Sequence, residues 1–197
     1  FFRQRIFHGQ PELIGQGGLA GVLRDQRFEQ LGGGLVRLAR RGGPHLTEAW
    51  IVESDLSKAE FRGSLLREAF FDESKFSGAH LSEARLEHSG FPGADFRGVA
   101  GLPRDCKGSN FSKSILSDVI AQGCCFEDCN FSEARLDRVD FSRCDLKNAD
   151  LSECALPGAR LIEAVLTGVS GNGAEFSGAD LSGACLAEAD LSDASLK

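Results

Sequence analysis

Large apolar residues recur at every fifth position from Ile51 to Leu196. Of these 30 positions, 26 hold Leu, Phe or Ile, and the exceptions are Gly101, Cys106, Ala121 and Gly171. The residue two places before each is small (Ala, Ser, Val or Cys) in 29 of 30 cases, Arg104 being the exception. A period of five gives a continuous apolar face on neither a helix, which turns about 100° per residue, nor a strand, which alternates faces. The pattern predicts a chain that runs extended for three residues, pointing in, out and in, and then turns a corner over two.

The two corner positions carry turn residues. Pro92-Gly93 and Pro157-Gly158 occupy both of them, as a type II turn favours. Of the 14 glycines after residue 50, 11 fall on the second corner position, where a positive φ is expected. Inward, outward and corner positions are therefore each specified separately along the chain.

The repeating unit is clearest in four segments, Ala94-Asp95-Phe96, Ala149-Asp150-Leu151, Ala179-Asp180-Leu181 and Ala189-Asp190-Leu191. These segments resemble the motif of the pentapeptide-repeat family, and the resemblance covers residues 44–197. It implies an all-β fold, a right-handed quadrilateral β-helix with 20 residues per coil. Residues 44–197 would then form about seven to eight coils.

Residues 1–43 do not follow the repeat and hold 10 of the 24 glycines. We expect a strand within residues 1–8 and short helices over residues 19–28 and 35–41, separated by a run of three glycines. This segment is predicted to form a small mixed or helical cap on the first coil. The chain has no methionine and stops in full repeat, so we expect either a piece of a longer protein or a homodimer through an uncapped C-terminal coil.

Residues 99–125 lack several large inward side chains, and Arg104 replaces a small one. We therefore predict an irregular coil or short loop there, centred on residues 101–108. Gly171 marks a second, smaller gap in the core.

Two exposed aromatic residues are the first candidate site. Trp50 and Phe70 are 20 residues apart at outward positions, so they should stack on one face, with Leu65 on the adjacent side. Aromatic residues on a polar rod indicate either a surface covered by the N-terminal segment or a binding site for another protein.

Charge suggests a second candidate site. Residues 1–50 carry seven Lys/Arg and four Asp/Glu, a net +3, and residues 51–197 carry 15 and 25, a net −10. Family members linked to quinolone resistance are similar to a charged rod of duplex dimensions and bind DNA gyrase. By that resemblance, an acidic face could mimic DNA phosphates, although the 15 interleaved basic residues argue against it. Its residues would be Asp140, Asp145, Asp150, Asp180 and Asp190.

Enzyme chemistry finds little support in the sequence. The segment Gly15-Gln16-Gly17-Gly18-Leu19-Ala20 imitates a dinucleotide-binding motif, but no βαβ unit fits before the repeats begin. Most of the seven cysteines fall on inward positions, without C-x-x-C or nearby His spacing. We expect no catalytic residues, no metal and no cofactor, and a reducing, cytoplasmic setting, with secretion as part of a longer protein left open.

The function predicted from these features is a non-catalytic interaction or scaffold module that binds another protein. The resemblance favours part of a larger bacterial protein, of the secretion adaptor or effector type. The alternative is a DNA mimic that binds gyrase. We expect no membrane span and no direct binding of nucleic acid.

Overall fold

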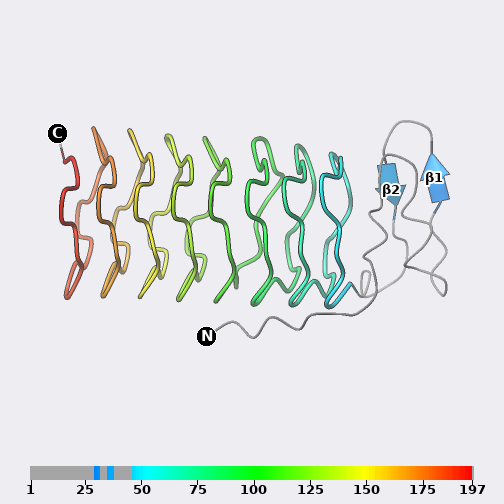
Figure 1. Ribbon diagram of the computed structural model, residues 1–197, viewed down its shortest axis with the longest axis horizontal. Helices are drawn as coiled ribbons and strands as arrows, with labels where there is room; N and C mark the ends of the chain where they lie inside the picture. Colours follow the sequence, from blue (N-terminus) through cyan, green and yellow to red (C-terminus); the bar gives the residue numbers. More distant parts are fainter. Residues whose placement is uncertain (1–28, 32–34, 38–45, 197) are drawn as a thin grey trace, which may run out of the picture.

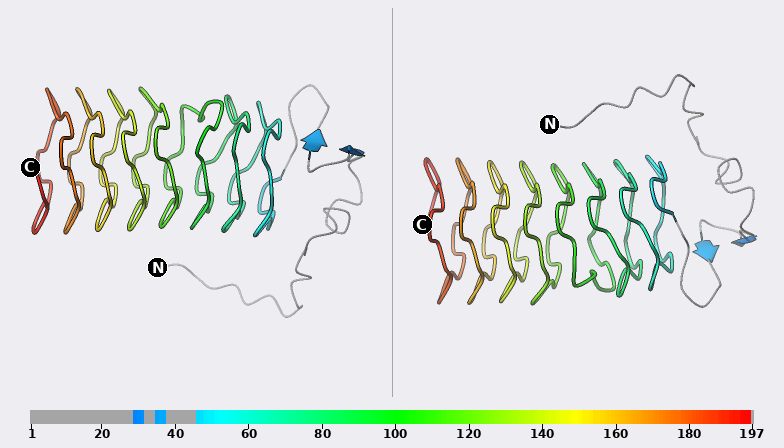
Figure 2. Two further views of the ribbon diagram at one scale, coloured as in Figure 1. Left: turned by 90° about the horizontal axis from the view of Figure 1, so that it is seen from above. Right: turned by 90° about the horizontal axis from the view of Figure 1, so that it is seen from below.

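The computed structural model describes residues 29–31, 35–37 and 46–196. Two short strands, β1 (Glu29–Leu31) and β2 (Leu35–Arg37), pair antiparallel with Leu31 opposite Leu35. Residues 46–196 form a stack of similar coils, seen side-on in Figure 1 and from two further sides in Figure 2. The repeat region is therefore a rod with its coils stacked along the long axis.

Each coil pairs with the next through parallel bridges between outward residues 20 positions apart, such as Asp150 with Ser170. Backbone hydrogen bonds join the same segments; for example, the Leu151 N–H donates to the Ser170 carbonyl at 2.6 Å. Because four outward residues fall within each 20-residue coil, the section has four sides. This geometry confirms the period of five as a coiled, four-sided β-structure.

The inward positions form one continuous core. All large inward side chains from Ile51 to Phe176 are buried, as are most of the small ones. Phenylalanines dominate the first half: Phe71, Phe91, Phe111 and Phe131 stack one coil apart, with ring centroids 5.1–5.2 Å apart and planes within 11°. Beyond Phe176 the interior opens, and Leu196 in the last coil is 59% exposed.

Serine and cysteine share a task at the small inward positions. The Ser109 hydroxyl donates to the Leu86 carbonyl at 2.7 Å, and the Cys154 thiol donates to the Phe131 carbonyl at 2.8 Å. In both cases the acceptor lies 23 residues earlier, on the preceding coil. The inward cysteines therefore act as small side chains that bond neighbouring coils together.

The corners reach a left-handed backbone without needing glycine. At the second corner position, 18 non-glycine residues have φ between 49° and 63°, as a type II turn requires. A hydrogen bond closes each turn; the Ala149 N–H, for example, donates to the Leu146 carbonyl at 3.0 Å. Because the turn and the coil-to-coil bonds fix this conformation, Glu, Asp, Lys and Arg are accepted where the sequence suggested glycine.

One coil is irregular, at the place that the sequence predicts. The corner turn is missing at residues 102–103, and regular turns resume at Lys107 (green in Figure 1). The Leu81 N–H donates to the Gly101 carbonyl, 20 residues on, whereas regular coils use an offset of 19. Leu102 is buried in the core and supplies the apolar side chain that Gly101 lacks, while Arg104 is exposed. The irregularity spans residues 100–104, a narrower segment than the predicted one.

The gap at Gly171 is filled from the next coil. A Cβ atom added to Gly171 would lie 2.7 Å from Cδ2 of Leu191, so the leucine occupies the space that a larger side chain would need. The second gap predicted from the sequence is thus closed by packing.

The N-terminal prediction is wrong in one respect. Residues 35–37 form β2 instead of the start of a helix, because two strands can pair across a run of three glycines and Val36 favours an extended backbone. The strand predicted within residues 1–8, the helix over 19–28 and the boundary at residues 43 and 44 lie outside the described residues.

Candidate interaction surface

The outward residues form four columns along the rod, one on each side. One column holds both candidate aromatic residues, and we call its side the aromatic face. From the N-terminal end it contains Trp50, Phe70, Gly90, Asn110, Asn130, Asp150, Ser170 and Asp190.

Trp50 and Phe70 stack on each other at the N-terminal end of the aromatic face. Their ring centroids are 4.7 Å apart and their planes are tilted by 33°. The Phe70 ring also covers Gly90, because a Cβ atom at Gly90 would come within 2.7 Å of Cδ1 of Phe70. Trp50 is 61% exposed. We call the two rings the aromatic patch.

Carboxylates border the aromatic patch on both edges. Four exposed glutamates occupy the corners beside it, and Asp72 is half-buried at the first corner position after Phe70. Burial and the nearby Glu73 raise the pKa of Asp72, whose Oδ1 is buried without a hydrogen-bond partner among the described residues. We call this group the acidic border: Glu48, Glu53, Glu68, Asp72 and Glu73.

Leu65 does not join the patch. It is half-buried in the column of the adjacent side, where it pairs with Arg85 of the next coil. The structure therefore brings Trp50 and Phe70 together and leaves Leu65 around the corner.

The five aspartates of the second candidate site do not share a side of the rod. Asp150 and Asp190 lie on the aromatic face, Asp140 and Asp180 lie in another column, and Asp145 lies in a third. Each carboxylate also has a local role, since Oδ1 accepts the backbone N–H two residues later at 2.9–3.1 Å. The sequence signal for this kind of capped turn is the spacing Asp-x-Ser, which four of the five aspartates share.

These capped turns allow a direct test. Replacing Asp150 with alanine is expected to lower the free energy of unfolding by about 1 kcal/mol, because the Ser152 N–H loses its acceptor. Asp150→Asn keeps an oxygen in place and should be close to neutral. Urea denaturation followed by circular dichroism measures both; equal losses for the two variants would contradict a capping role.

Basic residues elsewhere on the rod are paired with acids of neighbouring coils. Arg138 meets Asp118 at 2.7 Å, and Arg143 meets Glu163 at 2.8 Å, each pair joining residues one coil apart. The hydrogen bond from Arg138 lowers the pKa of Asp118. Positive and negative charges therefore alternate along these corners, and no long side of a single sign results.

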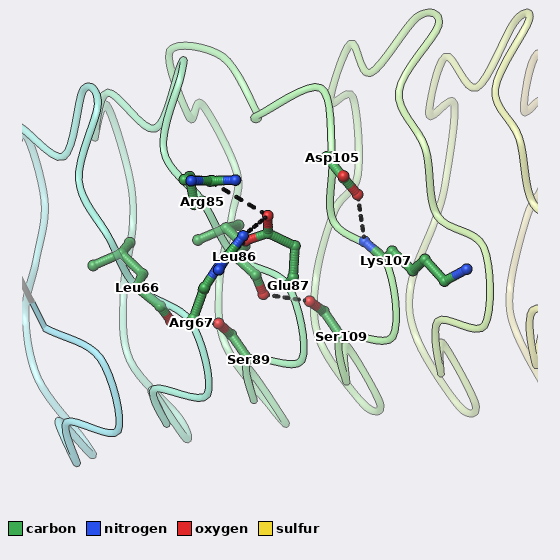
Figure 3. A network of polar contacts seen from close by, with 9 residues as sticks. All are labelled: Leu66, Arg67, Arg85, Leu86, Glu87, Ser89, Asp105, Lys107 and Ser109. Carbon is green, nitrogen blue, oxygen red and sulfur yellow. Dashed lines mark hydrogen bonds and ion pairs between the residues drawn. The ribbon is translucent and has the colours of Figure 1, made fainter.

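A shallow cavity of about 330 Å³ opens beside the irregular coil, lined by Arg67, Glu68, Glu87, His88, Asp105 and Lys107. Arg67 binds Glu87 through two bonds of 3.0 Å, and Arg85 approaches the same carboxylate at 3.5 Å, as Figure 3 shows. The Lys107 side chain points away from this group and binds Glu127 at 2.7 Å. Most charges of the cavity are thus already engaged in ion pairs within the chain.

The thiols offer no reactive centre in the described core. Burial raises the pKa of Cys124 to about 11 and that of Cys144 to about 12, so both remain protonated at neutral pH. Both are free cysteines, so the disulfide that their shared column allows is not formed. Within residues 29–31, 35–37 and 46–196, no three His, Cys, Asp or Glu side chains gather as metal ligands would. None of the described residues belongs to a helix long and apolar enough to cross a membrane.

Comparison with known proteins identifies the repeat. The family model "Pentapeptide repeats" matches this chain in eight copies, over residues 54–89, 66–99, 105–132, 124–161 and 159–197. The match confirms the resemblance drawn from the spacing of the residues. None of the curated proteins matches the chain.

Several solved structures share this type of repeat. HetL, a pentapeptide repeat protein involved in heterocyst differentiation regulation from the cyanobacterium Nostoc sp. strain PCC 7120, is 22% identical, with 77% of this chain and 89% of that chain covered and a TM-score of 0.30. A trypsin-treated point variant of QnrB1, a plasmid-mediated fluoroquinolone resistance protein, is 23% identical, with coverage of 83% and 80% and a TM-score of 0.44. Rfr23 from the cyanobacterium Cyanothece 51142 is 25% identical, with coverage of 69% and 86% and a TM-score of 0.29. At these scores the likeness carries no functional argument, and the assignment rests on the repeat itself.

Proposed function

Because the chain belongs to the pentapeptide-repeat family, we propose that it is a non-catalytic interaction module that presents one side of a rigid rod to a partner protein. The observation that carries this proposal is the aromatic patch. Large exposed aromatic residues are costly on a soluble surface and are enriched at the centres of protein interfaces. The rest of the aromatic face is polar apart from Gly90, which gives the patch a defined boundary.

Removing the patch tests this function. The double variant Trp50→Ala/Phe70→Ala, immobilised and exposed to a lysate of the source organism, should retain a specific partner at least about tenfold less well than the unchanged chain. Ile120→Ala is the matched control, since Ile120 is 70% exposed on a different side. Partner retention that survives in the double variant, or falls equally in the control, would rule out the patch as the docking site.

DNA mimicry is the second candidate function, and the net charge of −10 over residues 51–197 favours it. The geometry weighs against it, because the candidate aspartates are spread over three sides and serve as turn caps. A gyrase supercoiling assay decides the matter: an unaffected reaction at micromolar protein ends this alternative.

A further inference from the structure

The acidic border differs from the other charged corners in having no ion-pair partners among the described residues. Along residues 46–196, ten ion pairs join Lys or Arg to a carboxylate, and none involves a member of the border. The border instead surrounds the aromatic patch, and within it Asp72 holds a buried oxygen without a hydrogen-bond donor in the same part of the chain. Five carboxylates thus flank two stacked rings.

The rings and the carboxylates favour the same kind of ligand. The face of a tryptophan ring attracts a cation, and a planar guanidinium gains most because it can stack on the ring while its N–H groups reach carboxylates at the ring edges. A purely apolar partner would desolvate the border without compensation, and an anionic partner would be repelled. Charge complementarity therefore selects a basic ligand.

We infer that the aromatic patch and the acidic border together form a binding site for arginine side chains on a segment of a partner protein. Trp50 supplies the stacking surface, Phe70 supports its ring from the next coil, and the glutamates on both edges accept guanidinium hydrogen bonds. This inference rests on the proposed function, and it names the chemistry by which the module recognises its partner.

The sequence provides its own probe, because Trp50 is the only tryptophan in the chain. A short capped peptide in which arginine alternates with glycine is titrated into the intact chain while tryptophan emission is followed. We expect a saturable change in emission that weakens with added salt, since the border is exposed to solvent. The matching lysine peptide should bind at least about threefold more weakly, and the uncharged citrulline peptide about tenfold or more.

Matched variants locate the site. Glu53→Gln/Glu68→Gln, one residue from each edge, should raise the Kd for the arginine peptide by about fivefold. Glu153→Gln/Glu188→Gln changes the equivalent corners at the far end of the aromatic face and should leave Kd unchanged. Phe70→Leu keeps an apolar side chain against Gly90, removes the second ring, and should weaken binding by about threefold.

Several outcomes overturn the inference. Equal binding of the citrulline or lysine peptide contradicts arginine recognition, and equal effects of the two glutamine pairs contradict the location. The first 45 residues of this chain contain seven arginines and no lysine. If Arg37→Ser/Arg40→Ser/Arg41→Ser shifts the emission of the free chain opposite to the shift caused by the peptide, the occupant belongs to the chain itself and the partner assignment fails.

The test also separates this inference from the proposed function. If partner retention needs Trp50 and Phe70 but the arginine peptide leaves the emission unchanged, the interaction module stands and the arginine assignment falls. If the peptide binds and the double variant retains the partner normally, the arginine site is real and the docking role is wrong.

Discussion

Replacing Phe91 with alanine is expected to lower the free energy of unfolding by about 3–5 kcal/mol. The Phe91 ring lies nearly parallel to Phe71 and Phe111, with centroids 5.2 Å away on either side, and it meets Phe76 and Phe96 edge-on. Its loss removes the transfer free energy of a fully buried side chain and leaves a cavity, which the backbone bonds on both sides prevent from closing. Urea denaturation monitored by circular dichroism measures the change.

Leu186→Ala serves as the comparison for Phe91→Ala. Leu186 occupies the same kind of inward position, but it is 39% exposed near the C-terminal end of the rod. We expect a loss of about 1 kcal/mol or less, because little apolar area is withdrawn from water there. Similar losses for the two variants would mean that the phenylalanine stack contributes no more than an ordinary edge position.

The second large effect concerns a charge at the small inward position. Ala164→Arg should cost more than about 4 kcal/mol and leave the coil unable to close, since Ala164 is 1% exposed and a guanidinium there would be buried without a partner. Arg104 occupies the equivalent position in the same column, in the irregular coil, where its side chain is exposed. Arg104→Ala is therefore expected to change stability by less than about 0.5 kcal/mol.

Solubility and thermal unfolding of the two variants measure this difference. A well-folded Ala164→Arg protein would show that regular coils can turn such a side chain outward, as the irregular coil does. A large loss in Arg104→Ala would instead assign the exposed arginine a structural role.

The repeat positions made the core predictable, because inward, outward and corner residues differ in size and polarity at every step. The location of the irregular coil also followed from the sequence, since Gly101 and Arg104 break both inward rules. Its conformation did not: the replacement of Gly101 by Leu102 depends on a one-residue shift of the hydrogen bonds, which no local pattern encodes. The helix predicted at residues 35–41 failed because strand pairing outweighed a short apolar pattern.

The candidate site was predictable in part for the same reason. A separation of 20 residues placed Trp50 beside Phe70, whereas Leu65 belongs to another side. The acidic border was missed because its members are ordinary corner residues in the sequence and become a group only when two coils and two corners are combined. The aspartates were interpreted as a surface charge, but their spacing to the following serines indicates that they also cap turns.

The stacking of coils in single file determines how this rod would respond to a pulling force. The backbone hydrogen bonds between coils join adjacent coils, so tension applied at the two ends loads each layer in turn. A detached coil of 20 residues would release about 66–72 Å of extended chain. Stretching would therefore lengthen the molecule in equal increments, with the terminal layers peeling first and the phenylalanine-rich middle resisting longest.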